Sequence, residues 1–437
     1  MRKWTSYSFP NLHDPHAALL HYGKAYQDSM ILATNNYEHD RYHTFELIAA
    51  FGTKKKHTID NNKFPTDAFL HLRNFIDENK DDYLFGHFSY DLKNCIEQHS
   101  SNNPDHIRMP ELCFFQPEII IIANPYHISC GTLDDHPFNA ALFQSCCNTP
   151  IKEPLPDHHN IVKARVSKKE YLDTVHAIKN HIQQGDIYEM NYCQEFFIDK
   201  KVKLPPEILW YKLNQKSPMP FAAFYKLNDT YLLSTSPERF IARRENKIIS
   251  QPIKGTIKRG KSPEEDEYLR IFLQNNPKER SENIMIVDLV RNDLSKTAKK
   301  ASVNVEALFG VYPFPNVFQM ISTVTSEVTT DTSSADIIRH AFPMGSMTGA
   351  PKVKAMQLIE QYESVKRGLF SGSVGYFAPG GNFDFNVIIR SILMNTANEY
   401  LSFITGGAIT NASVAIDEYE ESMLKAKAMI DMLESRT

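Results

Sequence analysis

The sequence predicts an α+β protein built on a large antiparallel β-sheet. Short runs of alternating or β-branched residues recur along the chain, and several neighbouring runs are joined by turn residues. Helical patterns stand between groups of strands. A doubly wound parallel sheet would instead alternate strand and helix along the chain. The 437 residues are enough for roughly two to three domains.

Composition and charge narrow the class of protein. The formal net charge of -4 argues against a nucleic-acid-binding protein or a polybasic membrane-surface protein. The longest apolar run, Ile119 to Ala123, has the length of a strand, whereas a membrane span needs about 20 residues. The polar N-terminus predicts that there is no signal peptide. Six cysteines without metal or redox spacing fit the reducing cytoplasm.

Residues 1–150 form the first predicted region. The apolar residues of Thr66 to Asn79 recur with a helical period, and Asp82 to Leu92 is expected to be a strand. A polar segment containing prolines, Asn148 to Asn160, follows and is typical of a connection. The second predicted region therefore covers residues 160–437.

The second region carries the clearer helix and strand signals. Ser167 and Glu170 form a capping box, and Gly185 is placed to end the helix that follows it. Further helices are expected from Pro263, Pro277, Pro351 and Asp417. Strands are expected at Phe221 to Leu227, Thr230 to Ser234, Val317 to Val328, Gly372 to Phe377, Phe385 to Leu393 and Tyr400 to Thr405, the last one ended by a Gly406-Gly407-Ala408 loop.

Two pairs of glutamates are candidate metal ligands. Glu279 and Glu282 lie three residues apart on one predicted helix, as do Glu418 and Glu421 on the last helix. The same face of the last helix carries Ala428, so we expect that face to pack inward. Buried carboxylates are costly unless they are paired or bind a metal, and facing pairs would suit Mg2+. The alternative is two solvated pairs on exposed helices.

The segment Gln251 to Thr256 places a single lysine at the end of a predicted strand. Pro252 stiffens the backbone and Gly255 permits a close approach. Lys254, between them, would have little to solvate it, so a lowered pKa would make it a nucleophile. Glu238, expected on the neighbouring strand, would donate a proton to a leaving hydroxyl. The alternatives are a surface lysine and a cross-strand salt bridge.

Asn191 and Arg390 complete the polar candidates. Asn191 lies between bulky residues on a predicted strand and is grouped with Glu238 and Lys254. Arg390 follows three branched apolar residues, which indicates a cation held in a pocket, where arginine binds carboxylates through two parallel hydrogen bonds. The alternative is a strand-end arginine facing solvent. There is no Gly-x-Gly-x-x-Gly motif, which argues against dinucleotides and ATP.

The order of these motifs resembles that of the chorismate-utilising enzymes, which include anthranilate, aminodeoxychorismate, isochorismate and salicylate synthases. The resemblance covers about residues 165–437, with a weaker match at Gly86 to Leu92. The motifs are Ser234 to Phe240 (STSPERF), Pro252 to Thr256 (PIKGT), Glu282 to Asp293 (ENIMIVDLVRND), Gly349 to Lys352 (GAPK) and Glu418 to Glu421 (EYEE). The resemblance implies large antiparallel sheets packed as a sandwich with helices outside, and an anthranilate synthase component I-like region at residues 1–150.

The resemblance also implies a reaction. Anthranilate synthases have alanine in the middle of the Pro-Ile-x-Gly-Thr stretch and aminodeoxychorismate synthases have lysine, so Lys254 favours an aminodeoxychorismate synthase component I. Lys254 would attack C2 of chorismate while Glu238 protonates the leaving C4 hydroxyl. Ammonia would then displace the lysine, without pyridoxal phosphate, and give 4-amino-4-deoxychorismate for 4-aminobenzoate and folate synthesis.

The family also implies binding residues and a partner. Mg2+ would be held by Glu279, Glu282, Glu418 and Glu421, and chorismate would be contacted by Asn191, Thr256, Gln319, Ser346, Arg390, Gly406, Gly407 and Lys425. A separate glutamine amidotransferase subunit would supply the ammonia. Gln319 stands where anthranilate synthases carry histidine. Ile31 to Thr34 departs from the tryptophan-binding motif of the family, so tryptophan feedback is not expected.

Three alternatives stay open at this stage. The chain could be an anthranilate synthase component I, or could use water in place of ammonia and form isochorismate. A third hypothesis is that the protein is a catalytically weak scaffold that docks the amidotransferase. Retention of Lys254, Glu238 and the four glutamates argues against the scaffold. The identity of the product separates the two enzymatic alternatives from the leading hypothesis.

Overall fold

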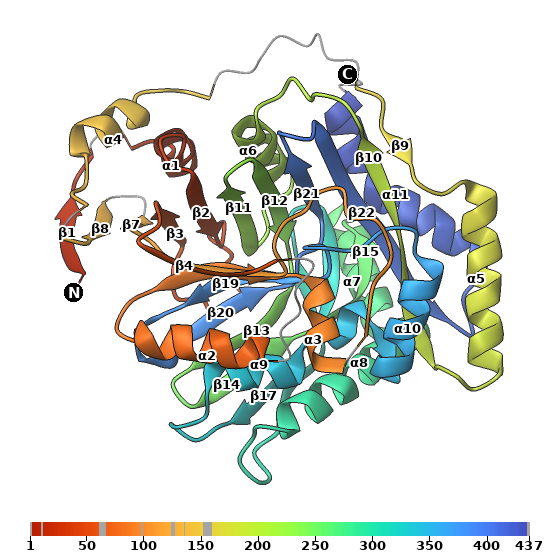
Figure 1. Ribbon diagram of the computed structural model, residues 1–437. Helices are drawn as coiled ribbons and strands as arrows, with labels where there is room; N and C mark the ends of the chain where they lie inside the picture. The colour runs from red at the N-terminus through yellow and green to blue at the C-terminus, as the bar shows by residue number, and fades with distance from the viewer. Residues whose placement is uncertain are drawn as a thin grey trace.

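The computed structural model describes residues 2–9, 12–60, 67–97, 99–123, 127–134, 136–151 and 160–434. In these ranges the strands form one sheet of twelve strands and one of ten, and the helices lie around them (Figure 1). Neighbouring strands are antiparallel, as in the pairs β10–β22 and β14–β17. The predicted α+β class with large antiparallel sheets is therefore confirmed.

The larger sheet combines strands from both predicted regions. In spatial order its strands are β1 (Lys3–Tyr7), β8 (Ile128–Thr132), β7 (Ile119–Ala123), β3 (Leu47–Phe51), β2 (Asp28–Ala33), β11 (Phe221–Leu227), β12 (Thr230–Ser236), β21 (Ser391–Asn395), β22 (Tyr400–Thr410), β10 (Glu189–Ile198) and β18 (Gly349–Ala350), with β9 (Lys163–Ala164) also paired to β10. The pairing of β2 with β11 joins the N-terminal strands to the rest of this sheet.

The smaller sheet also combines strands from both predicted regions. Its strands are β15 (Ile253–Lys258), β17 (Val317–Glu327), β14 (Lys247–Gln251), β13 (Arg239–Arg244), β20 (Phe383–Asn386), β19 (Ser373–Phe377), β5 (Leu84–Phe88), β6 (Leu112–Gln116) and β4 (Lys55–Ile59), with β16 (Asn304–Pro313) also paired to β17. Strand β16 was not predicted from the sequence. The predicted connection, 148–160, lies largely outside the described residues, so the division at this point stays a prediction.

Helices cover the outer faces of the two sheets. On the larger sheet lie α1 (Pro15–Gly23), α4 (Ala140–Cys147), α6 (Pro206–Lys216) and α11 (Ala415–Glu434). On the smaller sheet lie α2 (Ala68–Glu78), α8 (Pro277–Ser295) and α9 (Ser334–Ala341). Helices α5 (Lys168–Gln183) and α10 (Lys352–Tyr362) pack beside β10, α7 (Pro263–Asn275) packs beside β15, and α3 (Lys93–Glu97) is a short helix after β5.

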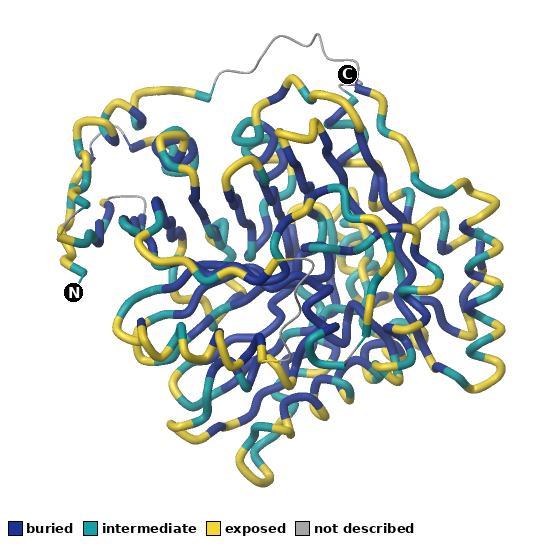
Figure 2. The backbone as a smooth tube through the Cα atoms, in the orientation of Figure 1, coloured by how far each residue is buried: buried dark blue, intermediate teal, exposed yellow. Residues whose placement is uncertain are grey.

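A third apolar cluster fills the space between the two sheets. It joins buried side chains of the larger sheet, such as Met30, Ala223 and Leu232, to Phe85 and Phe115 of the smaller sheet. The central strands are accordingly buried along their length, while the helices expose their outer sides (Figure 2). Because each fully buried large apolar side chain contributes about 1.5–3 kcal/mol, this layer holds the sheets face to face. The sandwich that the resemblance implied is confirmed.

Two predicted elements differ from the structure near the end of the chain. The strand predicted at Phe385 to Leu393 is interrupted, because β20 ends at Asn386 and Arg390 has a left-handed φ of 50°. The glycines predicted to form a loop lie inside β22 instead. Gly406 pairs with Cys193, and a Cβ on this glycine would come within 2.1 Å of the carbonyl oxygen of Tyr192. Glycine is thus required here for close strand pairing.

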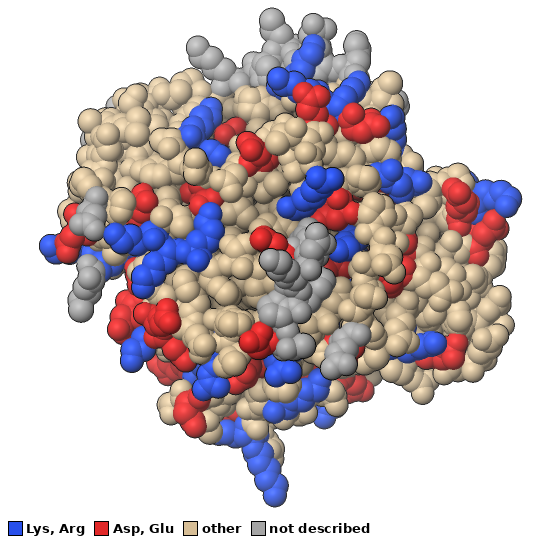
Figure 3. Space-filling model, viewed as in Figure 1, with Lys and Arg blue, Asp and Glu red and all other residues tan. Residues whose placement is uncertain are grey.

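The surface agrees with the charge balance of the sequence. On the face shown in Figure 3, basic and acidic side chains are interspersed. Within the described ranges, none of the helices combines the length and apolar character needed to cross a membrane. The capping box of Ser167 and Glu170 is present at the start of α5, as predicted.

Candidate active site

The predicted site residues meet where an edge strand of one sheet approaches the other sheet. Strand β15 lies at the edge of the smaller sheet and carries Lys254, while β10 lies near the edge of the larger sheet and carries Glu189 and Asn191. The Lys254 Nζ donates a hydrogen bond to Glu189 Oε1 at 2.9 Å. This contact joins the two sheets at the centre of the candidate site.

Lys254 is a nearly buried cation surrounded by acids. Its side chain is 10% exposed. Burial lowers the pKa of Lys254, but the carboxylates of Glu189, Glu282 and Glu238 raise this pKa by more, so it lies above its ordinary value. The lowered pKa that the sequence suggested is therefore wrong. The acids come from other elements, and their convergence on Lys254 cannot be seen in the local segment.

Glu189 is a functional candidate that sequence reasoning missed. It is fully buried at the start of β10 and forms an ion pair with Lys254. Side chains two residues apart on a strand point to the same face, and Asn191 was already a candidate. This alternation was the signal that could have identified Glu189.

Glu238 is a buried carboxyl group directly before β13. In the smaller sheet β17 and β14 lie between β13 and β15, so the prediction of a strand neighbouring Lys254 is wrong. The backbone N–H of Glu238 donates to Ser236 Oγ, which fixes the turn before the strand. The side chain is 4% exposed, and burial raises the pKa of Glu238 to about 7, although Ser346 and Lys254 act in the opposite direction. At neutral pH a substantial fraction of this group is protonated, as a proton donor must be.

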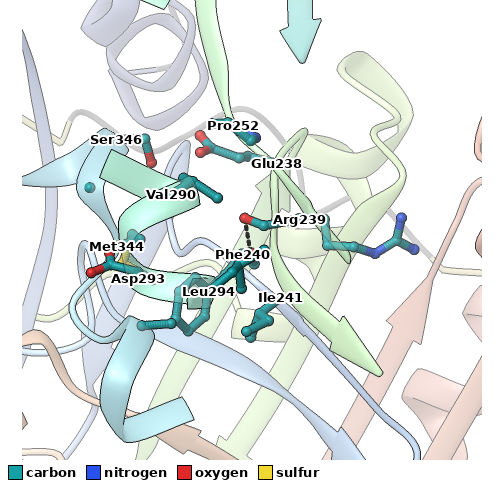
Figure 4. Close-up of a pocket in the computed structure, with 13 residues that line it drawn as sticks. Glu238, Arg239, Phe240, Ile241, Pro252, Val290, Asp293, Leu294, Met344 and Ser346 are labelled. Atoms are coloured by element: carbon teal, nitrogen blue, oxygen red, sulfur yellow. Dashed lines mark hydrogen bonds between the residues drawn. The ribbon is translucent and has the colours of Figure 1, made fainter. Parts of the chain in front are cut away.

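A small cavity adjoins Glu238 (Figure 4). Its volume of about 20 Å³ has room for about one water molecule, so this cavity is too small for a ring-shaped ligand. Arg239 points away from Glu238 in Figure 4 and forms ion pairs with Asp40 and Asp384. The side chains of Glu238 and Arg239, although adjacent in sequence, therefore lie in different regions of the protein.

Arg390, unlike Lys254, has no acidic side chain paired with it in the described part of the chain. It lies in the segment between β20 and β21, and burial lowers the pKa of Arg390 to about 10 despite the nearby Glu238. Within the described part of the chain, its guanidinium makes no hydrogen bond or ion pair. A desolvated guanidinium in this state favours an anionic ligand, above all a carboxylate.

The first glutamate pair lies on α8, close to Lys254. Glu279 approaches Gly255, since a Cβ on this glycine would lie 3.1 Å from Glu279 Oε2. Glu282 is buried, and this burial raises the pKa of Glu282 to about 7. The Nζ of Lys278 lies 3.9 Å from Glu282 Oε1 and 3.5 Å from Glu418 Oε1. Lys278, which sequence reasoning also missed, thus places a cation between the two glutamate pairs.

The second glutamate pair lies on α11, beside the glycines of β22. A Cβ on Gly407 would lie 3.3 Å from Glu418 Oε2, so the glycine leaves room for this carboxylate. Glu421 is half-exposed and forms an ion pair with Lys425 at 2.7 Å. The Nζ of Lys425 also donates to the carbonyl oxygen of Gly406 at 2.9 Å. These groups form the rim of the site.

The inward-facing stripe of α11 differs from the predicted one. The residues buried on this helix are Ala415, Glu418, Ser422, Ala426, Met429 and Leu433. Glu418 belongs to this stripe, whereas Ala428, Glu421 and Lys425 are exposed. The helix packs on β22 through its small residues Ser422 and Ala426, so the prediction that Ala428 packs inward is wrong.

The remaining candidates lie on the neighbouring strands. Asn191 Nδ2 donates to the carbonyl oxygen of Ser346 at 2.9 Å, which ties β10 to the Gly345–Met347 turn. Thr256 and Gln319 are paired in register on β15 and β17. Thr256 is exposed, but Gln319 is 1% exposed and its Oε1 has no hydrogen-bond partner in the described part of the chain. Gln319 therefore has an acceptor free for a ligand.

The four glutamates fit Mg2+ by their chemistry. Among the described residues, no three histidine, cysteine or acidic side chains are close enough together to hold a metal ion. However, Glu279, Glu282, Glu418 and Glu421 offer only carboxylate oxygens, which are the donors that Mg2+ prefers. Glu282 Oε1 is buried without a hydrogen-bond partner in the described ranges. The half-exposed Lys278 would have to leave the space between the pairs for a metal to enter.

The chain belongs to the chorismate binding enzyme family, which matches residues 28–431. Anthranilate synthase component I from Streptococcus pneumoniae TIGR4 has the same fold, with a TM-score of 0.75 and 24% identity over 88% of this chain and 91% of that one.

Within the family, aminodeoxychorismate synthases are prominent among the relatives. The chain is 35% identical to aminodeoxychorismate synthase component 1 of Klebsiella aerogenes, over 80% of this chain and 77% of the relative. It is 40% identical to the chloroplastic aminodeoxychorismate synthase of Arabidopsis thaliana over 60% of this chain, but spans only 28% of that longer protein. Anthranilate synthase component 1 of Aquifex aeolicus is 30% identical over 80% of this chain and 74% of its own length.

Proposed function

We propose that the protein is an aminodeoxychorismate synthase component 1, which converts chorismate and ammonia into 4-amino-4-deoxychorismate. The observation that carries this proposal is Lys254, which lies between the sheets and is hydrogen-bonded to a buried carboxylate. The similarity to the Klebsiella aerogenes enzyme supports the same reaction. Anthranilate synthase component I is the nearest alternative, because such a relative also matches most of the chain.

Chorismate is a dianion, and the site offers cations and amide groups for its carboxylates. Arg390 would bind one carboxylate through its unpaired guanidinium. Lys425, with the backbone of Gly406 and Gly407, would hold the other one at the rim, after exchanging part of its pairing with Glu421. The other proposed contacts are Asn191, Thr256, Gln319 and Ser346.

Mg2+ would be held by Glu279, Glu282, Glu418 and Glu421. When bound, the ion would neutralise and orient a substrate carboxylate, because Mg2+ commonly keeps waters and binds substrate oxygens. The residues of the chain do the remaining work. The Glu421→Ala variant should lose its Mg2+ dependence together with its activity, and a metal titration of this variant measures both.

Lys254 and Glu238 supply the covalent chemistry. Lys254, as the free amine, forms a bond to C2 of the ring, the double bond shifts, and the C4 hydroxyl leaves with the proton of Glu238 as water. Ammonia then bonds to C4, and Lys254 leaves C2 as an amine. The raised pKa of Glu238, about 7, keeps part of this carboxyl group in the acid form that the first half-reaction needs. Because Lys254 itself forms the covalent bond to the ring, the proposed reaction needs no pyridoxal phosphate.

We further propose that a separate glutamine amidotransferase subunit supplies the ammonia, and that the protein works in the cytoplasm in folate synthesis. The word "component" in the names of several relatives supports a second subunit. Free ammonium at high concentration would replace the partner in vitro.

A product assay tests the proposed function. The purified protein is incubated with chorismate, Mg2+ and ammonium, with or without the lyase that converts aminodeoxychorismate to 4-aminobenzoate. We expect 4-aminobenzoate only when the lyase is present. Direct release of fluorescent anthranilate would establish the alternative, and isochorismate would show that water is the nucleophile. Glu195→Gln alters a buried ion pair of β10 outside the site, so this variant serves as a matched control for substitutions of the site residues.

A further inference from the structure

Glu189 holds its carboxylate rigidly against the amine of Lys254. Its backbone is paired on both sides, with Thr410 of β22 and Ala350 of β18. The side chain is fully buried, and Oε1 accepts from Lys254 Nζ at 2.9 Å. Oε2 is buried and has no hydrogen-bond partner in the described part of the chain. A buried carboxylate with a free oxygen is costly to maintain, which points to a function.

The reaction requires a proton acceptor at this position. Lys254 forms an ion pair with the Glu189 carboxylate at 2.9 Å and is therefore an ammonium ion, whose nitrogen has no electron pair with which to attack. Glu238 must keep its own proton for the leaving hydroxyl. Glu282 is a proposed metal ligand and makes no ion pair with Lys254 in the structure. Among the described residues, Glu189 is the carboxylate in hydrogen-bond contact with this amine.

We propose that Glu189 stores the proton of Lys254 while the lysine is bonded to the substrate. Lys254 transfers one proton to Glu189 and attacks C2 as the free amine, while Glu238 gives its proton to the departing hydroxyl. When ammonia has bonded to C4 and the C2–N bond has broken, Glu189 returns the proton to the lysine. The new ammonium group on C4, or water, restores the proton of Glu238.

This role rests on the proposed synthase activity and makes a specific kinetic prediction. With Glu189, the proton of Lys254 remains inside the site through the cycle. With glutamine at this position, the shape and one acceptor are retained, but the proton must leave to water before each attack. The activity of the variant should then depend on the fraction of Lys254 that is already neutral, which grows tenfold with each pH unit below the lysine pKa.

The test compares the kcat of wild type, Glu189→Gln and Glu195→Gln in the ammonium-dependent assay from about pH 6 to pH 9. This range includes the ordinary pKa of histidine and approaches the ordinary pKa of lysine. We expect Glu189→Gln to lose roughly 100-fold in kcat at pH 7, with a small change in the KM for chorismate. The ratio of its kcat to that of wild type should rise steadily with pH. This ratio cancels the titration of Glu238, which both proteins share.

Glu195→Gln controls for the loss of a buried carboxylate on the same strand. Glu195 pairs with Arg165 and Tyr400, away from Lys254, so its variant should keep the wild-type pH profile. Parallel profiles for Glu189→Gln and wild type would overturn the proton role, because a purely structural contact lowers the rate equally at every pH. A Glu189→Gln variant as fast as wild type at pH 7 would overturn it as well.

A second measurement does not depend on activity. Substrate-free protein is treated with trinitrobenzenesulfonate, and the labelling of Lys254 is followed by peptide mass spectrometry. Removal of the Glu189 charge should increase the labelling rate of Lys254, whereas Glu195→Gln should not change it. Equal labelling in all three proteins would refute the pairing itself. Failure of wild type to form aminodeoxychorismate would instead refute the proposed function, and the labelling rates separate these two outcomes.

Discussion

Replacement of Glu238 by glutamine should stabilise the fold while it removes the synthase activity. Burial raises the pKa of Glu238 from its ordinary 4.5 to about 7. In wild type, the folded state therefore binds more protons than the unfolded state between these values, and stability is lost as the pH rises through this window. The difference between 4.5 and about 7 corresponds to about 3 kcal/mol, at 1.36 kcal/mol for each pKa unit. Glutamine cannot ionise, so the variant avoids this loss.

Urea unfolding, followed by the fluorescence of the two tryptophans, provides the measurement at several pH values. The stability of Glu238→Gln relative to wild type should increase between pH 4.5 and about 7 and then stay constant, with a total gain of about 3 kcal/mol. The synthase rate should fall by roughly 100-fold or more, because the proton donor is lost. A stability difference that does not change with pH would refute the raised pKa. Normal activity in the variant would refute the acid role.

Two further predictions follow from ion pairs. Lys278→Met should lower the apparent dissociation constant for Mg2+ by about five- to thirtyfold, because the two ion pairs of the half-exposed Lys278, of about 0.5–1 kcal/mol each, no longer compete with the metal; a metal titration of activity measures this, and weaker Mg2+ binding would contradict it. Asp384→Asn should destabilise the fold by about 3 kcal/mol, because buried Arg239 loses one of its two partners; an unchanged urea midpoint would contradict this prediction.

The fold class could be predicted from local patterns. The combination of strands from both predicted regions in each sheet could not. Proline in the first helical turn and the capping box located several helices, since these signals act within a few residues. The pairings of β2 with β11 and of β5 with β19 join segments far apart in the chain, and no local pattern encodes them. The break before β21 was also missed, because it depends on the left-handed backbone of Arg390.

The candidate site shows the same limit. Lys254 and Glu238 were found because they lie in recognisable motifs, and the structure brings them together. Glu189 and Lys278 lie outside those motifs and acquire their importance only from contacts across β10, α8 and α11. The direction of the Lys254 pKa was wrong for this reason: burial alone lowers it, but three carboxylates from other elements outweigh burial.

The central claim is that Lys254 is the nucleophile. Its most direct test is the product formed by Lys254→Ala from chorismate, Mg2+ and ammonium, compared with wild type by chromatography. We expect wild type to form aminodeoxychorismate. We expect the variant to form none, with slow release of anthranilate as the reaction that remains open to a site with alanine at this position. Aminodeoxychorismate formation by the variant at the wild-type rate would contradict the role of Lys254.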